Sequence, residues 1–282
     1  MPIISSFGGG SIRGFRGSEV SGPTPFSAGN YDLNNLLQTR VDIDLPNGYS
    51  HDVAGNFVSP DRLNYYFADS AGNVTQFKMS TPHDITTMTF ERRIGGFGSG
   101  GRRAFTLSSI GHRLYIVAEV SRVVTVYELS TPWNIGTASE IYIFTLEQQG
   151  NELYPHAQRF SPDGSIYVVQ EYTESPNLKA YDLGTPWDPR TRNLRSEATH
   201  QVNIVRNMGL SDDGTVVALV NGNDVVHFFD MTTPWQPSSL TNFDFKPEFA
   251  GGPNFSITNC CISGEYLYVG TGVKLNQYTN IV

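Results

Sequence analysis

A motif of about twelve residues that recurs four times is the feature that most constrains the fold of this chain. Its aliphatic and aromatic positions alternate, which predicts a strand with one face in a core. Thr-Pro ends that strand because proline has no backbone N–H to donate to a sheet. The copies read VTQFKMSTPHDI from Val74, VTVYELSTPWNI from Val124, LKAYDLGTPWDP from Leu178 and VVHFFDMTTPWQP from Val225.

A fifth copy of the strand, LNQY, ends at Tyr278, close to the last residue of the chain. The conserved aromatic position of the motif therefore occurs five times, at intervals of 50, 54, 48 and 49 residues: Phe77, Tyr127, Tyr181, Phe229 and Tyr278. A fixed period of this length is typical of repeat architectures.

A second signature, consisting of a strand, a tight turn and another strand, precedes each copy. Its fullest form, Ser-Pro-Asp-Gly, begins at Ser161. Proline presets φ, aspartate hydrogen-bonds its own backbone, and glycine accepts a positive φ, so this tetrapeptide predicts a turn. We align the serines at intervals of 50, 52, 50 and 52 residues: Ser59, Ser109, Ser161, Ser211 and Ser263.

Four strands fit into each repeat, and four strands in about 50 residues make a propeller blade. The predicted blades span residues 50–95, 103–150, 154–202, 203–248 and 255–282. The last has room for three strands, so we expect the alternating segment 39–46, TRVDIDLP, to supply the fourth and to close the ring. The sequence thus predicts an all-β, five-bladed β-propeller over residues 39–282. A β-sandwich does not need so regular a period, and the donated strand argues against an open solenoid.

The residue after Thr-Pro is an aromatic ring in all four complete copies, and every tryptophan of the chain is among them: Trp133, Trp187, Trp235 and, in the first copy, His83. Two roles fit these rings. Each could cover the seam between neighbouring blades, or together they could stack sugars. We favour the seam, because a single blade cannot bury its own faces.

Composition excludes several classes of partner. The net charge of −8 provides no basic field, so we expect no nucleic-acid partner. No stretch approaches the ~20 apolar residues that span a bilayer, so we expect no membrane insertion. No basic segment followed by an apolar run opens the chain, so we expect no signal peptide. Cys260 and Cys261 are adjacent in sequence, which predicts free thiols rather than a disulfide.

The innermost strands of a propeller are the ones to search for catalytic residues. Glycoside hydrolysis needs two carboxylates, and the strands before the Ser turns offer Asp52 but no second one. They offer a polar or cationic channel instead, from His156, Arg159, Arg206, Asn207 and Asn259. GFGSGG, from Gly96, matches G-x-G-x-x-G but lacks the βαβ context of a dinucleotide site. Zinc and calcium spacings are absent, so we expect no catalytic residue, no metal and no cofactor.

Residues 1–38 show no period and are rich in glycine, serine and proline. Such a segment does not form a core of its own. It carries spaced apolar side chains with two arginines between them, which favours an extended arm that orders on another subunit. We expect docking through Ile4, Phe7, Ile12, Arg13, Phe15 and Arg16, with Ile3 and Phe26 as further anchors.

Two motifs resemble proteins of tailed bacterial viruses. SSFGGGSIRGFRG, in the arm, resembles the Gly-Ser-x-Arg-Gly-Phe stretch that opens many of their structural proteins. LSTPWNI and LGTPWDP are similar to the Ser-Thr-Pro-Trp-Asp repeats of viral proteins, notably from marine and cyanobacterial phages. His83 departs from this repeat.

The resemblance implies a non-enzymatic virion protein of the tail, its fibres or the capsid exterior, assembled in the bacterial host cytoplasm. Its partners would be other virion structural proteins and, on the outside of the particle, a host-surface glycan. The alternatives are a lectin-like, carbohydrate-binding propeller and, less favoured, a glycoside hydrolase.

Overall fold

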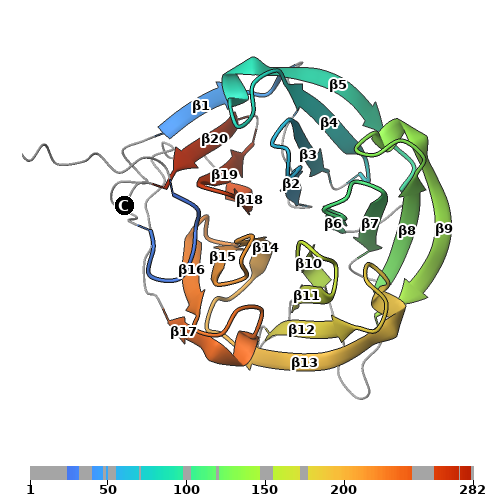
Figure 1. The fold of residues 1–282 in the computed structure, drawn as a ribbon. Coiled ribbons are helices and arrows are strands. Elements are labelled where there is room, and N and C mark those ends of the chain that lie inside the picture. Colours follow the sequence, from blue (N-terminus) through green and yellow to red (C-terminus); the bar gives the residue numbers. More distant parts are fainter. Residues whose placement is uncertain are drawn as a thin grey trace, which may run out of the picture.

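Five four-stranded antiparallel sheets stand around a central axis, as Figure 1 shows. The structure is a computed structural model and describes residues 24–31, 40–46, 49, 55–69, 71–97, 103–118, 121–146, 155–171, 177–242, 257–272 and 274–280. The predicted five-bladed all-β propeller is confirmed.

Blades I to IV each consist of four strands that are consecutive in sequence. Blade I contains β2 (Asn56–Val58), β3 (Asn64–Ala68), β4 (Val74–Met79) and β5 (Met88–Ile94). Blade II contains β6 (Arg103–Leu107), β7 (Arg113–Ala118), β8 (Val123–Leu129) and β9 (Ala138–Thr145). Blade III contains β10 (Pro155–Phe160), β11 (Ile166–Glu171), β12 (Asn177–Leu183) and β13 (Arg192–Thr199). Blade IV contains β14 (Val205–Leu210), β15 (Val216–Asn221), β16 (Val226–Met231) and β17 (Leu240–Asn242).

Blade V combines the two ends of the chain. It contains β18 (Ile257–Ser263), β19 (Tyr266–Thr271), β20 (Lys274–Thr279) and, on its outer edge, β1 (Arg40–Asp44). β1 pairs antiparallel with β20, so that Arg40 lies opposite Tyr278 and Asp44 opposite Lys274. The predicted donation of the N-terminal strand is confirmed, and it covers an edge that would otherwise be free to pair.

The hydrophobic core lies between the blades. Tyr65 and Phe77 of blade I share one cluster of buried side chains with Tyr268 of blade V. Another cluster brings Ile166 and Val168 of blade III against Val217 and Leu219 of blade IV. Because each face is buried against the next sheet, a blade depends on its neighbours for stability.

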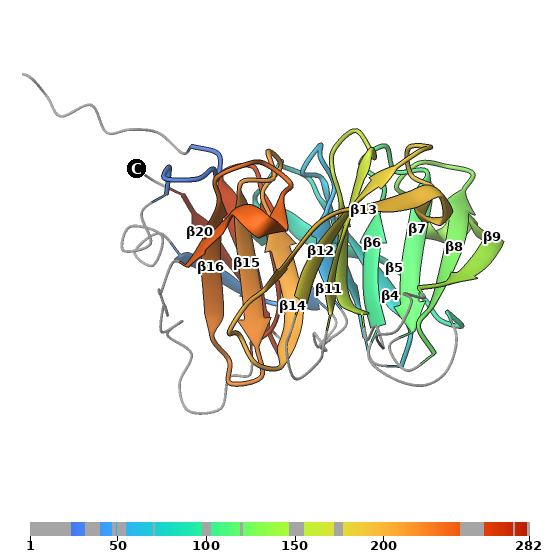
Figure 2. The same cartoon turned by 90° about the horizontal axis from the view of Figure 1, so that it is seen from below.

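The Ser turns connect the first two strands of each blade and lie together at one end of the ring, which we call the turn face (Figure 2). In blades I to IV, the serine Oγ accepts a hydrogen bond from the backbone N–H five residues later, at 2.9–3.0 Å. In blade II that serine is Ser108, so the alignment on Ser109 was wrong by one residue. Ser109 donates instead to the carbonyl oxygen of Pro162 in blade III.

The turns after Thr-Pro fold back onto these Ser turns. Each tryptophan adopts a positive φ, between 59° and 65°. Its backbone N–H donates to the carbonyl oxygen of the glycine in the Ser turn of the same blade. The indole covers that glycine so closely that an added Cβ would lie 2.1–2.4 Å from the ring. Only glycine fits beneath it. The pairs are Trp133 with Gly111, Trp187 with Gly164 and Trp235 with Gly214.

A short 3₁₀ helix follows each Thr-Pro-aromatic turn and leads into the outer strand. These helices are η2 (Ile85–Thr87), η3 (Ile135–Thr137), η4 (Pro189–Thr191) and η5 (Pro237–Ser239). In the first three, the side chain of the residue after the aromatic accepts a backbone N–H at the start of the helix, at 2.9–3.1 Å: Asp84, Asn134 and Asp188. This capping explains the polar residue at that place in the motif.

Blade I departs from the tryptophan pattern for a local reason. The glycine position of its Ser turn holds Arg62, at a φ of 60°, so a Cβ stands where an indole would lie. His83 keeps the hydrogen bond from its N–H to the carbonyl oxygen of Arg62, at 3.1 Å. Its imidazole lies against the ring of Tyr266 in blade V, with centroids 4.2 Å apart.

Residues 24–31, predicted as part of the arm, supply a fifth Thr-Pro-aromatic turn. The N–H of Phe26 donates to the carbonyl oxygen of Gly264 at 3.1 Å, the bond that each tryptophan makes in its own blade. The N–H of Thr24 donates to the carbonyl oxygen of Asn280, also at 3.1 Å. Phe26 is 2% exposed and packs with Phe228 and Tyr278. The turn of blade V is thus assembled from both chain ends, and part of the predicted 1–38 arm lies on the ring.

Candidate functional site

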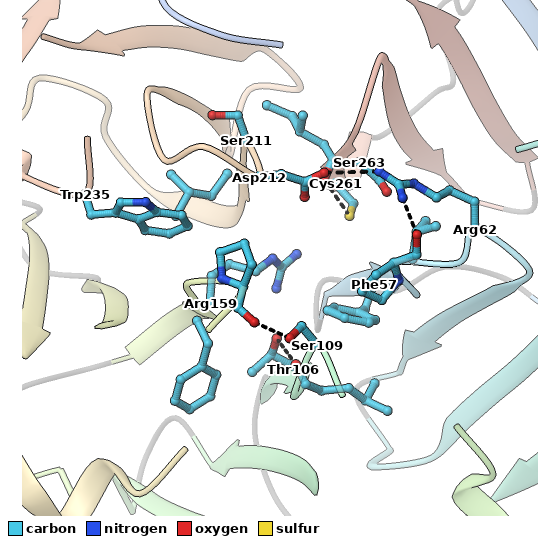
Figure 3. A pocket seen from close by; sticks show the side chains of 17 residues that line it. Phe57, Arg62, Thr106, Ser109, Arg159, Ser211, Asp212, Trp235, Cys261 and Ser263 are labelled. Carbon is cyan, nitrogen blue, oxygen red and sulfur yellow. Dashed lines mark hydrogen bonds and ion pairs between the residues drawn. The ribbon is translucent and has the colours of Figure 1, made fainter. Parts of the chain in front are cut away.

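A cavity of about 280 Å³ opens at the mouth of the central channel, on the turn face (Figure 3). All five blades contribute to its lining, since the Ser turns and the ends of the innermost strands converge there. Blades I to V contribute, among others, Phe57, Thr106, Arg159, Ser211 and Cys261 in that order. A site of this kind depends on closure of the whole ring.

Arg159, at the end of β10, occupies the centre of this cavity (Figure 3). Its side chain is 6% exposed. Nη2 donates to the carbonyl oxygen of Asn56 in blade I at 2.7 Å, and Nη1 donates to those of Phe105 in blade II at 3.4 Å and Gln158 at 2.9 Å. One guanidinium therefore links three blades. Among the described residues, no carboxylate lies within ion-pair distance of it.

The rim of the cavity carries one ion pair. Nη2 of Arg62 lies 3.3 Å from Oδ2 of Asp212, and the N–H of Gly264 donates to the same oxygen at 3.1 Å. Aromatic rings of Phe57, Phe160 and Trp235 form apolar parts of the wall. Asp212 is the one carboxylate of the described lining, so this cavity lacks the pair of carboxylates that glycoside hydrolysis uses.

Three of the other residues predicted for the channel make structural contacts. Oδ1 of Asn207 accepts the N–H of Cys260 at 3.4 Å. His156 Nδ1 contacts the carbonyl oxygen of Val205 in the next blade at 2.7 Å, and Arg206 pairs with Asp224 at 2.8 Å. Asn259 is fully buried, and its Oδ1 and Nδ2 have no hydrogen-bond partner among the described residues. Asp52 lies outside the described residues.

The two cysteines are buried and free. Burial raises the pKa of the Cys260 thiol to about 12, and burial likewise raises that of Cys261. Both are thiols rather than thiolates at neutral pH, which makes them poor nucleophiles.

The four aromatic residues predicted to stack glycans or to cover seams lie in four separate turns. The carbonyl oxygen of Trp133 accepts the hydroxyl of Tyr66 in blade I at 2.6 Å, and that of Trp187 accepts the hydroxyl of Tyr115 in blade II at 2.7 Å. His83 Nδ1 lies 2.8 Å from the hydroxyl of Tyr268 in blade V. These turns therefore join adjacent blades. Trp235 is the member of the set that lines the cavity.

Burial raises the pKa of Tyr66 and of Tyr115 well above the usual range, so both hydroxyls keep their protons and donate. The residues predicted for docking (Ile4, Phe7, Ile12, Arg13, Phe15 and Arg16) lie outside the described residues. Within the described part of the chain, no three histidine, cysteine or acidic side chains come together as metal ligands, and no helix has the length and apolar character to cross a bilayer.

Comparison with known proteins gives matches in structure alone. No family model matches the chain, and no curated protein matches it. Two similar solved structures are each named "putative 6-phosphogluconolactonase". The one from Bacteroides uniformis has a TM-score of 0.43 and 15% identity, over 70% of this chain and 54% of that one. The one from Bacteroides fragilis has a TM-score of 0.43 and 14% identity, over 73% of this chain and 58% of that one. The chain thus spans little more than half the length of either protein.

Proposed function

We propose that this protein is a non-enzymatic structural component of a tailed-phage virion, which docks through the residues before Thr24 and presents the propeller for assembly or attachment. The observation that carries the proposal is the anchoring of residues 24–31 on the ring. Asn280 Nδ2 donates to the carbonyl oxygens of Thr24 and Asn30, each at 2.9 Å. Tyr31 donates its hydroxyl to Asp230 at 3.1 Å.

This anchoring gives the N-terminal segment a fixed point of departure. Thr24 lies at the seam between blades IV and V, where its N–H bonds to Asn280 and where Phe26 is buried. Whatever residues 1–23 bind is therefore held at one position on the rim of the turn face. That is the arrangement that a docking arm needs, and the arm and Thr-Pro-Trp motifs are the ones that resemble phage structural proteins.

The experiment is a truncation that begins at residue 24, made in the phage that encodes the protein. Because 24–31 stays in place, the truncated ring should melt within about 2 °C of the full chain. Its amount in purified particles, measured by quantitative mass spectrometry against the major capsid protein, should fall at least tenfold.

A full-length variant controls for the shorter chain length of the truncated protein. It combines Ile4→Ser, Phe7→Ser, Ile12→Ser and Phe15→Ser, and it should be lost from particles to a similar extent. Normal incorporation of both variants would contradict docking through the arm. Absence of the unmodified protein from purified particles would contradict the virion assignment itself.

A further inference from the structure

The cavity at the channel mouth holds a buried cation, and no carboxylate of the described residues lies within ion-pair distance of it. Arg159 is 6% exposed, and its three hydrogen bonds go to neutral backbone carbonyls. A buried charge is costly unless an opposite charge compensates it. Among the described residues, the nearest candidate on the rim is Asp212, which is already held by Arg62 and by the N–H of Gly264.

The guanidinium also retains donors. Arginine has five N–H groups, and the contacts to Asn56, Phe105 and Gln158 use three of them. The Nε–H and one Nη2–H donate to no oxygen or nitrogen of the described part of the chain, and the Cys261 thiol beside the guanidinium is only a weak acceptor. Two donors of one planar guanidinium match the two oxygens of a carboxylate or phosphate group.

The rest of the lining suits the body of a small organic molecule. The cavity of about 280 Å³ is at the small end of ligand pockets. Rings of Phe57, Phe160 and Trp235 supply apolar contact, and the hydroxyl-bearing residues Thr106 and Ser263 also line it. Two arginines against one aspartate leave the lining with a net positive charge.

We propose that this cavity binds a small organic anion, whose carboxylate or phosphate group contacts Arg159 and whose ring or apolar body lies against Phe57, Phe160 and Trp235. Arg62 assists from the rim, where it can turn from Asp212 to the ligand. The site requires no step of chemistry and is independent of the docking arm, so it can be tested on the isolated protein.

Benzoate and phenyl phosphate are the probes, with benzyl alcohol as the uncharged analogue and inorganic phosphate as the anion without a ring. Isothermal titration calorimetry at low salt should give dissociation constants below about 1 mM for the two ring anions. Benzyl alcohol and inorganic phosphate should each bind at least tenfold more weakly. The affinity for the ring anions should fall as salt is added.

Matched arginine variants locate the binding. Arg62→Gln should weaken phenyl phosphate about tenfold. Arg195→Gln serves as the control because Arg195, like Arg62, is about one-third exposed and paired with an aspartate, Asp182, at 2.8 Å, but lies on an outer strand. It should change the affinity less than twofold. Arg159→Gln should abolish binding.

Crystals soaked in 4-bromobenzoate test the floor of the cavity even if Arg159→Gln does not fold. The bromine should give an anomalous peak inside the cavity, with the carboxylate beside the Arg159 guanidinium. No binding by either ring anion, equal binding of benzyl alcohol, equal effects of the Arg62 and Arg195 variants, or a peak elsewhere would each overturn the proposal.

Discussion

The turn of blade III and the turn of blade V perform the same task with different chain connectivity. In blade III, Thr-Pro and Trp187 follow the third strand directly, and the indole lies on Gly164 of the same blade. In blade V, the third strand ends near the C-terminus, and Thr24, Pro25 and Phe26 return from the other end of the chain. The backbone hydrogen bond from the aromatic residue to the glycine carbonyl is nonetheless the same, at 3.0 Å to Gly164 and 3.1 Å to Gly264.

The agreement extends beyond the aromatic residue. After Trp133 in blade II, the N–H of Thr137 donates to the carbonyl oxygen of Asn134 at 3.0 Å. After Phe26, the N–H of Asn30 donates to that of Ser27 at 2.9 Å, with the same spacing. Each Ser turn is therefore covered by a Thr-Pro-aromatic turn, and that covering turn need not follow the third strand of the same blade in sequence. Closure of this ring consists of a turn as well as a strand.

Truncating the ring of Phe26 is expected to have the largest effect. Phe26→Ala leaves a cavity among Phe228, Tyr278 and Tyr31, and it should lower the free energy of unfolding by about 3–5 kcal/mol. The melting temperature should fall by roughly 10 °C, as measured by differential scanning calorimetry. Phe26→Trp is the matched control because it introduces the residue of the other turns, and overpacking should limit its cost to about 1–3 kcal/mol. If Phe26→Ala costs as little as that control, residues 24–31 are not part of the ring in solution.

A smaller change in stability should distinguish a Ser-turn glycine covered by an indole, Gly164, from one that is not, Gly264. Gly164 and Gly264 both have a positive φ, of 72° and 56°, so alanine is strained by about 1 kcal/mol at either. At Gly164 the new Cβ would also lie 2.1 Å from the indole of Trp187, whereas at Gly264 the nearest atom is the flexible Nη2 of Arg62 at 3.1 Å. Urea unfolding should therefore show that Gly164→Ala costs about 2 kcal/mol more than Gly264→Ala. Equal costs would mean that the indole moves aside freely.

The ring could be predicted from the sequence because its signals are local and repeated. The spacing of Phe77, Tyr127, Tyr181, Phe229 and Tyr278 determines the number of blades, and the unpaired third strand of the last blade required a donor such as 39–46. The alternation of β1 identified that donor. These features depend on strand periodicity and turn chemistry, which a few neighbouring residues determine.

The fifth turn was missed although its signal is present. GPTPFSAGN contains Thr-Pro, an aromatic residue and a small polar residue, as the repeat does. A period measured along the chain cannot place it, because its partner Gly264 is 238 residues away and the order of the two is reversed. Thr24 is recognised as part of blade V only when the strand donation of β1 is used to join the two ends.

The cavity could not be predicted at all beyond its polar character. Arg159 was expected in the channel, but its contacts with the carbonyl oxygens of Asn56 and Phe105 come from two other blades. They follow from the diameter of the closed ring, which no single repeat contains. The one-residue error at Ser109 has the opposite origin, since two adjacent serines fit the same turn template and only the hydrogen bond from Arg113 to Ser108 distinguishes them.

The third kind of turn, in blade I, should make part of the stability depend on pH. Burial, with a smaller contribution from Arg62, lowers the pKa of His83 to about 4 although Glu265 acts in the opposite direction. A histidine whose pKa is lower in the folded chain than in the unfolded one stabilises the folded state while it is neutral, because the unfolded chain binds the proton more readily. Its contribution is complete above pH 6.5 and is lost as the pH falls from 6.5 to 4. Because the imidazole keeps an exposed edge, the loss should be on the order of 1 kcal/mol.

His83→Phe isolates this contribution, because it keeps a ring against Tyr266 and cannot be protonated. His200 is also lowered to about 4 by burial, and it remains in both proteins. Unfolding free energies of wild type and His83→Phe are measured by urea titration at pH 7.5 and at pH 4.5. On acidification, the wild type should lose stability relative to His83→Phe. The turns built on Trp133, Trp187, Trp235 and Phe26 contain no ring that titrates between pH 4.5 and pH 7.5, so the same comparison with Trp133→Phe should show no shift. A pH-independent difference for His83→Phe would mean that the imidazole is solvated in the folded ring, and that the seam between blades I and V depends on other contacts, such as the hydrogen bond from Gln277 Nε2 to the carbonyl oxygen of His83.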